Sequence, residues 1–595
     1  MLAGMPNKPQ HRPTCRNVDF VSREFTMKKA KLDTSGRQAG MIGSRRRFLQ
    51  GGALLAVQAS LGASAASLAG ETYCNGLIKG NKEVTADTTY GKVRGFQTPD
   101  GVKTFRGIPY GADTSGKNRF MPPRKPAPWT GVRDAVEWGS ISPQMMSTSL
   151  GETQMYLGGP TEGRQGEDCL VLNVWTTQQK AAAKLPVYVR IHGGGYSTGS
   201  GNRPLYIGHN AARRGVVYVS MNHRLDILGY MDLSKFGGQF EQSGNAGLLD
   251  LVLMLEWVRD NIENFGGDPS RVMIAGESGG GSKVSTLLGT APAQGLFHRA
   301  VIESGPALTA RSRDDSSSFT DRYLAHLGVD KSKIADVQSL PFTRLFEAYF
   351  TLMDRRWHPQ DKPPQGNFSP VVDGAIIPQK MFEPTATTLS AGIPLIIGHN
   401  KDEGTFFRQS DGELYAIDDA GLKSRVAAMV GAESADQVIA VYRGVYPGAS
   451  PSQLMIQMGT DTSMGVRSAS LAERKADLRK APVYVFRFDW PSPCFDGRFG
   501  ATHGLEIPFV TDNISEMQVM THDLPEAHAL SAKMMDTWIS FATTGDPNNK
   551  SIPLWRPYSS AERTVMLFDN EIRPVSDPHG AEIRKLWSTL TVVRT

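Results

Sequence analysis

Cysteine is scarce in this chain, and long hydrophobic runs are missing. Four cysteines stand among 595 residues, no two of them in a C-x-x-C spacing, and the histidines are scattered. The sequence therefore does not predict a structural metal site. No segment offers the roughly 20 uncharged apolar residues that a membrane-spanning helix needs. We accordingly expect neither a metal nor a stable membrane span.

A basic surplus that would indicate nucleic-acid binding is also missing from most of the chain. The net charge is +6, but residues 1–70 alone hold eleven Lys or Arg against three acids. The remainder is slightly acidic, so we expect no nucleic-acid partner. Internal repeats and the G-x-x-x-x-G-K-[ST] phosphate loop are absent too. Hydrophobic and charged fractions of 40% and 21% are ordinary for a soluble globular protein.

The N-terminal region has the features of an export signal. Residues 44–50 (SRRRFLQ) resemble the twin-arginine motif of bacterial leaders, a weakly apolar stretch follows over 51–62, and 63–65 form an A-x-A pattern. We expect residues 1–65 to be an extension with a signal peptide that the twin-arginine export machinery recognises. The mature protein is then periplasmic or secreted. The alternative is a basic tail before a short helix.

Short apolar strands alternate with helices from about residue 85 onward. The pattern predicts a helix over 248–262. It predicts strands over 187–191, 216–221, 272–275, 299–303, 393–397 and 483–488. Such alternation is typical of an α/β fold with a mainly parallel sheet covered on both faces. Residues 306–390 and 405–480 read as helical insertions. No linker divides the chain, so we expect one catalytic domain over 66–595.

A candidate nucleophile lies in residues 276–280 (GESGG), which match G-x-S-x-G between a predicted strand and a predicted helix. A sharp turn there lifts the Ser278 hydroxyl to the top of the sheet. It also starts a helix whose N-terminus favours developing negative charge. The alternative is an ordinary glycine-rich turn.

A candidate oxyanion loop lies upstream, in residues 192–196 (HGGGY) after the 187–191 strand. Three glycines allow backbone N–H groups to approach a substrate carbonyl closely, and one such donor contributes roughly 10²–10³ in rate. A flexible glycine loop is the alternative. The order of the two motifs favours the catalytic interpretation of both.

The base and the acid remain open on residue evidence alone. In this architecture the acid and then the histidine follow the nucleophile. His503 follows a strand and a Pro/Gly-rich loop, whereas Asp402 and Glu403 follow the 393–397 strand. Either acid could orient an imidazole. The competing histidines are His298, His326, His358, His399, His522, His528 and His579.

Together these segments resemble the type B carboxylesterase and cholinesterase family, from about residue 90 to 558. Segments similar to those of the family are 105–110 (FRGIPY), 166–175 (GEDCLVLNVW), 244–250 (GNAGLLD), 264–269 (NFGGDP) and 541–548 (FATTGDPN). The resemblance implies an α/β-hydrolase fold with a large, mostly parallel sheet and helical insertions around the active-site gorge.

The resemblance also assigns roles. It implies a triad of Ser278, Glu403 and His503, with oxyanion donors at the positions of Gly194, Gly195 and Gly279. The implied reaction is two-step acyl transfer from a small-molecule ester to water, without a cofactor.

Three departures from the family pattern carry expectations of their own. The usual cysteine upstream of Cys169 is missing, which leaves Cys74–Cys169 as a possible disulfide. Gly279 replaces a common alanine, which should loosen the elbow slightly. Lys283 either extends to solvent or faces the pocket, where it would favour anionic substrates.

Other functions use the same segments. An amidase, a lactonase or a polymer or xenobiotic ester hydrolase would share the triad, since pocket walls decide the leaving group. A non-catalytic binding protein is disfavoured because all three triad positions are filled. Met145, Met146, Met155 and Tyr156 form either an adaptable apolar rim or ordinary core.

Overall fold

The computed structural model describes residues 73–74, 79–80, 82–145, 163–354, 366–408, 411–578 and 580–590. The chain divides into two units, Met1–Ser67 and Leu68–Thr595, and the second holds all of the described residues. The expected export signal lies outside the described residues, as do Met146, Met155 and Tyr156 of the expected rim.

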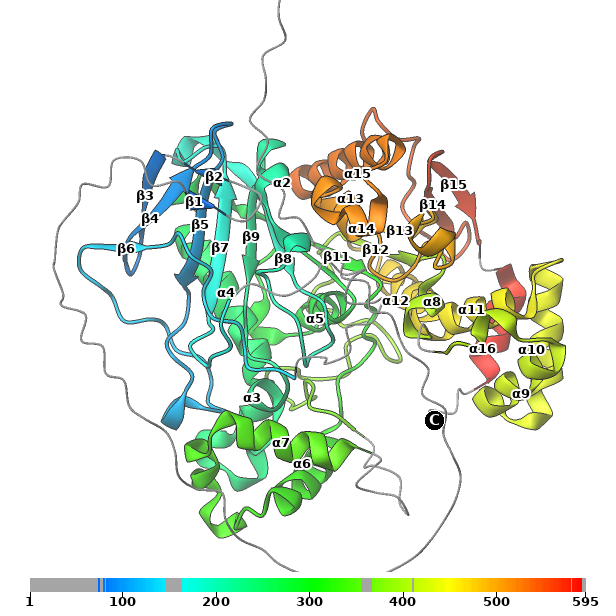
Figure 1. Ribbon diagram of the computed structural model, residues 1–595, viewed down its shortest axis with the longest axis horizontal. Helices are drawn as coiled ribbons and strands as arrows, with labels where there is room; N and C mark the ends of the chain where they lie inside the picture. Colours follow the sequence, from blue (N-terminus) through cyan, green and yellow to red (C-terminus); the bar gives the residue numbers. More distant parts are fainter. Residues whose placement is uncertain are drawn as a thin grey trace, which may run out of the picture. The chain divides into compact units, whose positions relative to one another are not determined.

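A 13-stranded sheet forms the centre of the second unit (Figure 1). Its main path runs β15-β14-β13-β12-β11-β10-β8-β9-β7-β5-β4-β3, and β6 pairs with β4. The strands are β3 (Lys82–Thr88), β4 (Gly91–Gln97), β5 (Lys103–Pro109), β6 (Val132–Asp134), β7 (Val171–Thr176), β8 (Leu185–Ile191), β9 (Val217–Met221), β10 (Gly267–Glu277), β11 (Arg299–Glu303), β12 (Leu395–Asn400), β13 (Val483–Phe488), β14 (Thr564–Phe568) and β15 (Arg573–Ser576). A separate pair joins β1 (Tyr73–Cys74) to β2 (Lys79–Gly80).

The sheet is mixed, and its parallel part lies in the middle. Strands β9, β8, β10, β11, β12, β13 and β14 pair in parallel, whereas β7, β5, β4 and β3 on one side and β15 on the other are antiparallel. The expected parallel character therefore holds for the central strands, whose carboxyl ends carry the candidate site.

Side-chain alternation covers both faces of the central strands. Val187, Val189 and Ile191 of β8 join the core that includes α4 (Ala246–Asn261) and α5 (Gly279–Leu288). Tyr188, between them, points into the opposite core with α15 (Pro525–Thr544). Burial on both faces favours apolar residues at consecutive positions, and the one charged residue of β8, Arg190, is buried in an ion pair with Glu303 (2.6 Å).

The two expected insertions are helical. The first holds α6 (Arg313–Leu327) and α7 (Phe342–Met353), which lie together in Figure 1. The second holds α8 (Glu403–Phe407), α9 (Asp419–Val430), α10 (Ala432–Val445), α11 (Pro451–Thr460) and α12 (Val466–Asp477). Helices α9, α10 and α11 share a third core with α16 (Gly580–Thr589). The remaining α-helices are α2 (His209–Arg213), α3 (Asp226–Tyr230), α13 (Ile507–Thr511) and α14 (Gln518–Thr521).

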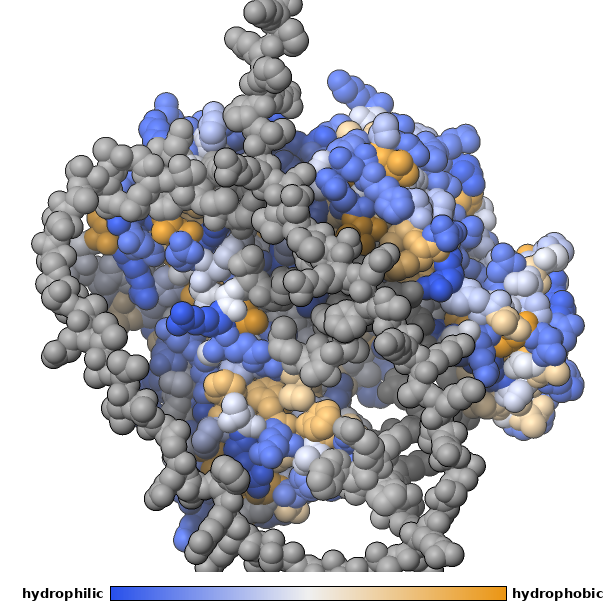
Figure 2. Space-filling view, viewed as in Figure 1, coloured by the Kyte–Doolittle hydropathy of each residue, from blue (hydrophilic) through white to orange (hydrophobic). Residues whose placement is uncertain are grey.

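Figure 2 shows hydrophilic residues over much of the coloured face, with smaller hydrophobic patches between them. Among the described residues, no helix combines the length and the apolar character needed to cross a membrane.

Candidate active site

The turn that carries Ser278 is strained. Strand β10 ends at Glu277, helix α5 begins at Gly279, and Ser278 between them has φ 55° and ψ −123°. This conformation is costly for a residue with a Cβ, and its surroundings hold it in place. The Ser278 N–H donates to the Glu303 carbonyl (2.8 Å), and the Ser278 carbonyl accepts from the Ser282 N–H (2.9 Å). The structure thus has the sharp strand-to-helix turn that the sequence predicts.

His503 and Glu403 meet in the fold although 100 residues separate them. The Nδ1 of His503 contacts the Oε2 of Glu403, and both side chains are buried. The other oxygen of Glu403 accepts from the Ser304 hydroxyl (2.5 Å) and from the Asn400 N–H (2.7 Å). Because Glu403 begins α8 directly after β12, its carboxylate is fixed at the carboxyl end of the sheet.

Asp402, the other acid considered, has a different position. Its carboxylate accepts from the Ala501 N–H (2.9 Å) and from the Gln457 amide (3.0 Å). These bonds join α8 to the loop before His503 and to α11. Asp402 therefore lies beside the site as a structural acid, and Glu403 is the acid in contact with the imidazole.

Four of the five competing histidines that the structure describes have side-chain partners elsewhere, and the fifth, His522, caps the C-terminus of helix α14. His298 accepts from the Val272 N–H (3.2 Å), and the His399 ring lies 2.9 Å from its neighbour's carbonyl. His326 pairs with a threonine hydroxyl and His528 with Asp523. His358 and His579 lie outside the described residues.

A third carboxylate faces His503 from the nucleophile turn. The Oε1 of Glu277 lies 3.2 Å from the Nε2 of His503. Nδ1 faces Glu403 and Nε2 faces the residue next to Ser278, so the imidazole bridges the acid and the elbow. The sequence gives no signal for Glu277 as a site residue, because it occupies the variable position of G-x-S-x-G.

These buried groups shift one another's pKa values. Burial alone would lower the pKa of His503, but the carboxylates of Glu277 and Glu403 raise it to about 9. Burial raises the pKa of Glu277 to about 7, against the opposing charge of His503. Burial also acts to raise the pKa of Glu403, yet the charge and hydrogen bond of His503 bring it below its usual value. Glu403 is therefore the carboxylate that stays ionised.

The glycine loop after β8 is held through its carbonyls. Gly194 and Gly195 have φ 89° and 62°, which a side chain would disfavour. The Gly193 carbonyl lies 2.9 Å from the His192 Nδ1, and the Gly194 carbonyl accepts from the Thr198 N–H (2.9 Å). In a trans peptide the next N–H points away from the carbonyl. These bonds therefore fix the directions of the Gly194 and Gly195 N–H groups, neither of which donates to another described residue.

Lys283 anchors both ends of the same loop. Its Nζ donates to the His192 carbonyl (3.1 Å) and to the Gly195 carbonyl (2.8 Å), and it lies 5.8 Å from the centre of the Tyr196 ring. The side chain is fully buried, and burial lowers its pKa to about 7. Both expectations for Lys283, extension to solvent and exposure in the pocket, are wrong. The reason is that its face of α5 packs against the glycine loop.

Gly279 has a similar explanation. A Cβ at this position would overlap the backbone of Gly195. The expected loosening of the elbow stays a prediction, but the structure gives the glycine a steric reason as well. The glycine removes the one atom that would push the loop away from α5, so that Gly279 lies close against Gly195.

The disulfide between Cys74 and Cys169 does not form. Cys169 and Cys494 are buried free thiols, and burial strongly raises the pKa of Cys169. Cys169 instead belongs to the main hydrophobic core, where its small apolar side chain fills space.

Ser278 opens into a cavity of about 750 Å³ that Gly195, Gly279 and Phe407 also line. The Phe407 ring lies 4.7 Å from the imidazole of His503.

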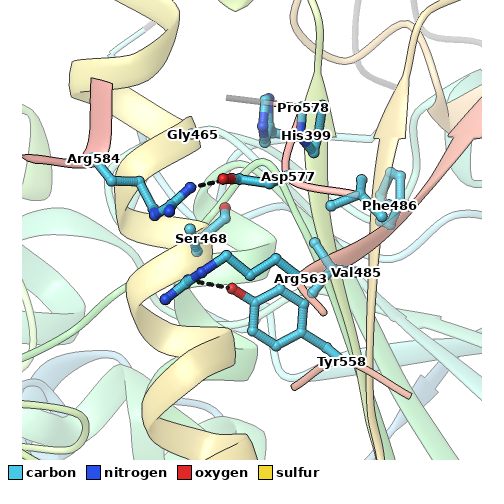
Figure 3. Close-up of a pocket in the computed structure, with 12 residues that line it drawn as sticks. His399, Gly465, Ser468, Val485, Phe486, Tyr558, Arg563, Asp577, Pro578 and Arg584 are labelled. Atoms are coloured by element: carbon cyan, nitrogen blue, oxygen red, sulfur yellow. Dashed lines mark hydrogen bonds and ion pairs between the residues drawn. The ribbon is translucent and has the colours of Figure 1, made fainter. Parts of the chain in front are cut away.

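A second cavity, shown in Figure 3, measures about 20 Å³, room for roughly one water molecule. Its cations are already paired, Arg563 with Tyr558 and Glu473 and Arg584 with Asp577, so it offers no comparable site. No cluster of metal-binding side chains occurs among the described residues.

Comparison with known proteins agrees with this geometry. Residues 82–587 match the model of the carboxylesterase family. The chain is 34% identical to the para-nitrobenzyl esterase of Bacillus subtilis over 84% of its own length and 98% of that protein. It is 32% identical to the phenmedipham hydrolase of Pseudarthrobacter oxydans, over 84% and 99%. The solved carboxylesterase of Geobacillus stearothermophilus superimposes with a TM-score of 0.72 at 32% identity, over 84% of this chain and 99% of that one.

Proposed function

The chain belongs to the carboxylesterase family and is a carboxylic ester hydrolase with an α/β-hydrolase fold, and we propose that Ser278, Glu403 and His503 are its catalytic triad. The observation that carries this proposal is the buried contact between His503 Nδ1 and Glu403, beside a strained serine turn. Nδ1 is held by the acid, so Nε2, which also lies 3.2 Å from Glu277, is the nitrogen that takes the serine proton.

The reaction then proceeds in two steps. His503 takes the Ser278 proton as the hydroxyl attacks the ester carbonyl, and it returns the proton to the departing alcohol. Water, activated by the same imidazole, releases the acid from the acyl-enzyme. The N–H groups of Gly194, Gly195 and Gly279 donate to the oxyanion in both steps.

Glu403 and Glu277 have different roles at the imidazole. Its lowered pKa keeps it ionised, so that it orients the imidazole and stabilises the imidazolium as it forms. Glu277, with its raised pKa, regulates how readily Nε2 holds a proton.

Steady-state hydrolysis of 4-nitrophenyl butyrate tests the triad. Ser278→Ala, His503→Gln and Glu403→Gln should each lower kcat by about 10³-fold or more, because the three groups act as a unit. Asp402→Asn is the matched control, since this neighbouring acid does not touch the imidazole; its kcat should stay within about threefold. Equal losses in Asp402→Asn and Glu403→Gln would contradict the assignment.

We further propose that the twin-arginine machinery exports the precursor to the periplasm. The support is the SRRRFLQ segment with the apolar and A-x-A stretches after it. In a bacterial host, replacing the arginines of residues 45–47 with lysine should leave the precursor in the cytoplasm. Fractionation that still finds the processed protein in the periplasm would refute this route.

A further inference from the structure

The described residues in the wall of the Ser278 cavity include more cations than acids. Arg311, Lys380 and Arg467 line it, and Asp315 is the one acid among these described lining residues. Arg311 follows β11, Lys380 lies in the 366–394 segment, and Arg467 lies on α12. Three separate parts of the chain therefore bring cations to the same space in which the ester must lie.

Backbone carbonyls accept the main hydrogen bonds of Arg311. Its Nη1 donates to the Asn367 carbonyl (2.7 Å) and its Nη2 to the Asp315 carbonyl (3.1 Å), both neutral backbone acceptors. No carboxylate of the described residues lies within ion-pair distance of it, although the charge of Asp315 partly offsets the effect of burial, which lowers its pKa; its buried Nε has no hydrogen-bond partner among them. The guanidinium is half-buried, so water compensates its charge only in part.

Arg467 adds its charge near the oxyanion loop. Burial raises the pKa of Tyr196 to about 12, although the charge of Arg467 acts in the opposite direction. Gly195, Tyr196 and Arg467 line the same cavity, which places this charge and the oxyanion loop on one wall. A substrate whose carbonyl reaches the loop is therefore within the field of both arginines.

We propose that the preferred substrates are esters that carry a free carboxylate, such as half-esters of dicarboxylic acids, with the carboxylate bound by Arg311 and Arg467. A guanidinium offers planar donors that match a carboxylate, and such a charged hydrogen bond is about twice as strong as a neutral one. Lys380, more exposed, adds longer-range attraction. This inference rests on the proposed function, because it concerns the cavity at Ser278.

The test compares monomethyl adipate with methyl hexanoate, which replaces the distal carboxylate with a methyl group. Acid release is followed in a pH-stat, and the readout is the ratio of the two kcat/KM values. Wild-type protein should prefer the adipate. Arg311→Gln and Arg467→Gln should each lower the ratio about tenfold, the effect of one charged hydrogen bond. Lys380→Gln should lower it by about twofold, as an exposed charge does.

Arg313→Gln is the control. Arg313 begins α6, but its guanidinium donates to Ser234 and to the Asp373 carbonyl and does not line the cavity. Its ratio should equal that of the wild type. In the wild-type protein, raising the salt concentration from 0.05 M to 0.5 M should also lower the ratio, a result that does not depend on how any variant folds.

The outcomes separate the two levels of the proposal. Hydrolysis of both esters with a ratio that neither the arginine variants nor salt changes would overturn the carboxylate preference and leave the triad intact. Hydrolysis of neither ester by wild-type protein, together with no hydrolysis of 4-nitrophenyl butyrate, would overturn the proposed function itself.

Discussion

Replacing Lys283 with methionine should show how much the support of the oxyanion loop contributes to stability and to kcat, because it leaves the three triad residues unchanged. Methionine keeps the length of the side chain and its apolar stem but removes the ammonium group. The His192 and Gly195 carbonyls, at 3.1 and 2.8 Å from Nζ, then lose their shared donor. Each buried carbonyl left unpaired costs about 1–3 kcal/mol. The free energy of unfolding should therefore fall by roughly 2–6 kcal/mol, less the gain from no longer burying an amine.

The catalytic effect should exceed what the stability loss explains. The loop relaxes away from α5, and the Gly194 and Gly195 N–H groups no longer converge on the oxyanion. Misplacing one such donor lowers kcat by roughly 10²–10³. Because the oxyanion exists only in the transition state, KM should change little.

Lys475→Met is the matched control for this prediction. Lys475 is also buried, also donates to two backbone carbonyls (Ser390 at 2.6 Å and Ala391 at 2.9 Å), and its pKa is lowered by burial to about 8. It lies on α12 and does not touch the glycine loop. Both variants should lose stability in urea unfolding, but only Lys283→Met should lose kcat at a temperature where both are folded. Equal kcat values for the two variants would refute the reasoning.

Three further results follow from the site. Glu277→Gln removes a carboxylate that raises the pKa of His503, so the imidazole becomes neutral at lower pH. The acid limb of the kcat/KM profile should therefore move to lower pH. An unchanged acid limb would be contrary evidence. Gly279→Ala should lower kcat by at least about tenfold, since its Cβ overlaps Gly195 and displaces an oxyanion donor; wild-type kcat in this variant would show that the loop moves freely. Cys169, buried and with a raised pKa, should not react with a thiol reagent until the protein unfolds.

Residue patterns were sufficient to predict the elements that position the site. The run of apolar residues over 187–191 predicts β8, and the period of 248–262 predicts α4, because both are set by burial along the chain. The strand expected over 272–275 extends in the structure to Gly267–Glu277. Its additional residues at the N-terminal end are polar and pair irregularly with β8, so they carry no apolar signal.

What the sequence could not predict depends on contacts between distant segments. Lys283 and Gly195 are 88 residues apart, and no local pattern indicates that an ammonium group closes the loop. The disulfide expectation failed for a related reason: chain order gives no information about whether Cys169 faces a partner or the core. Residue patterns alone also left the choice between Asp402 and Glu403 open, because adjacent residues at the start of a helix point in different directions; only the family resemblance selected Glu403.

The most direct test of the proposed mechanism is covalent labelling of the nucleophile. The purified protein is treated with a fluorophosphonate, its intact mass is measured, and the labelled peptide is mapped. We predict a single adduct on Ser278 that disappears in His503→Ala, because only a base-activated serine reacts at such a rate. A folded protein that takes no label, or that is labelled at another serine, would contradict the assignment of Ser278.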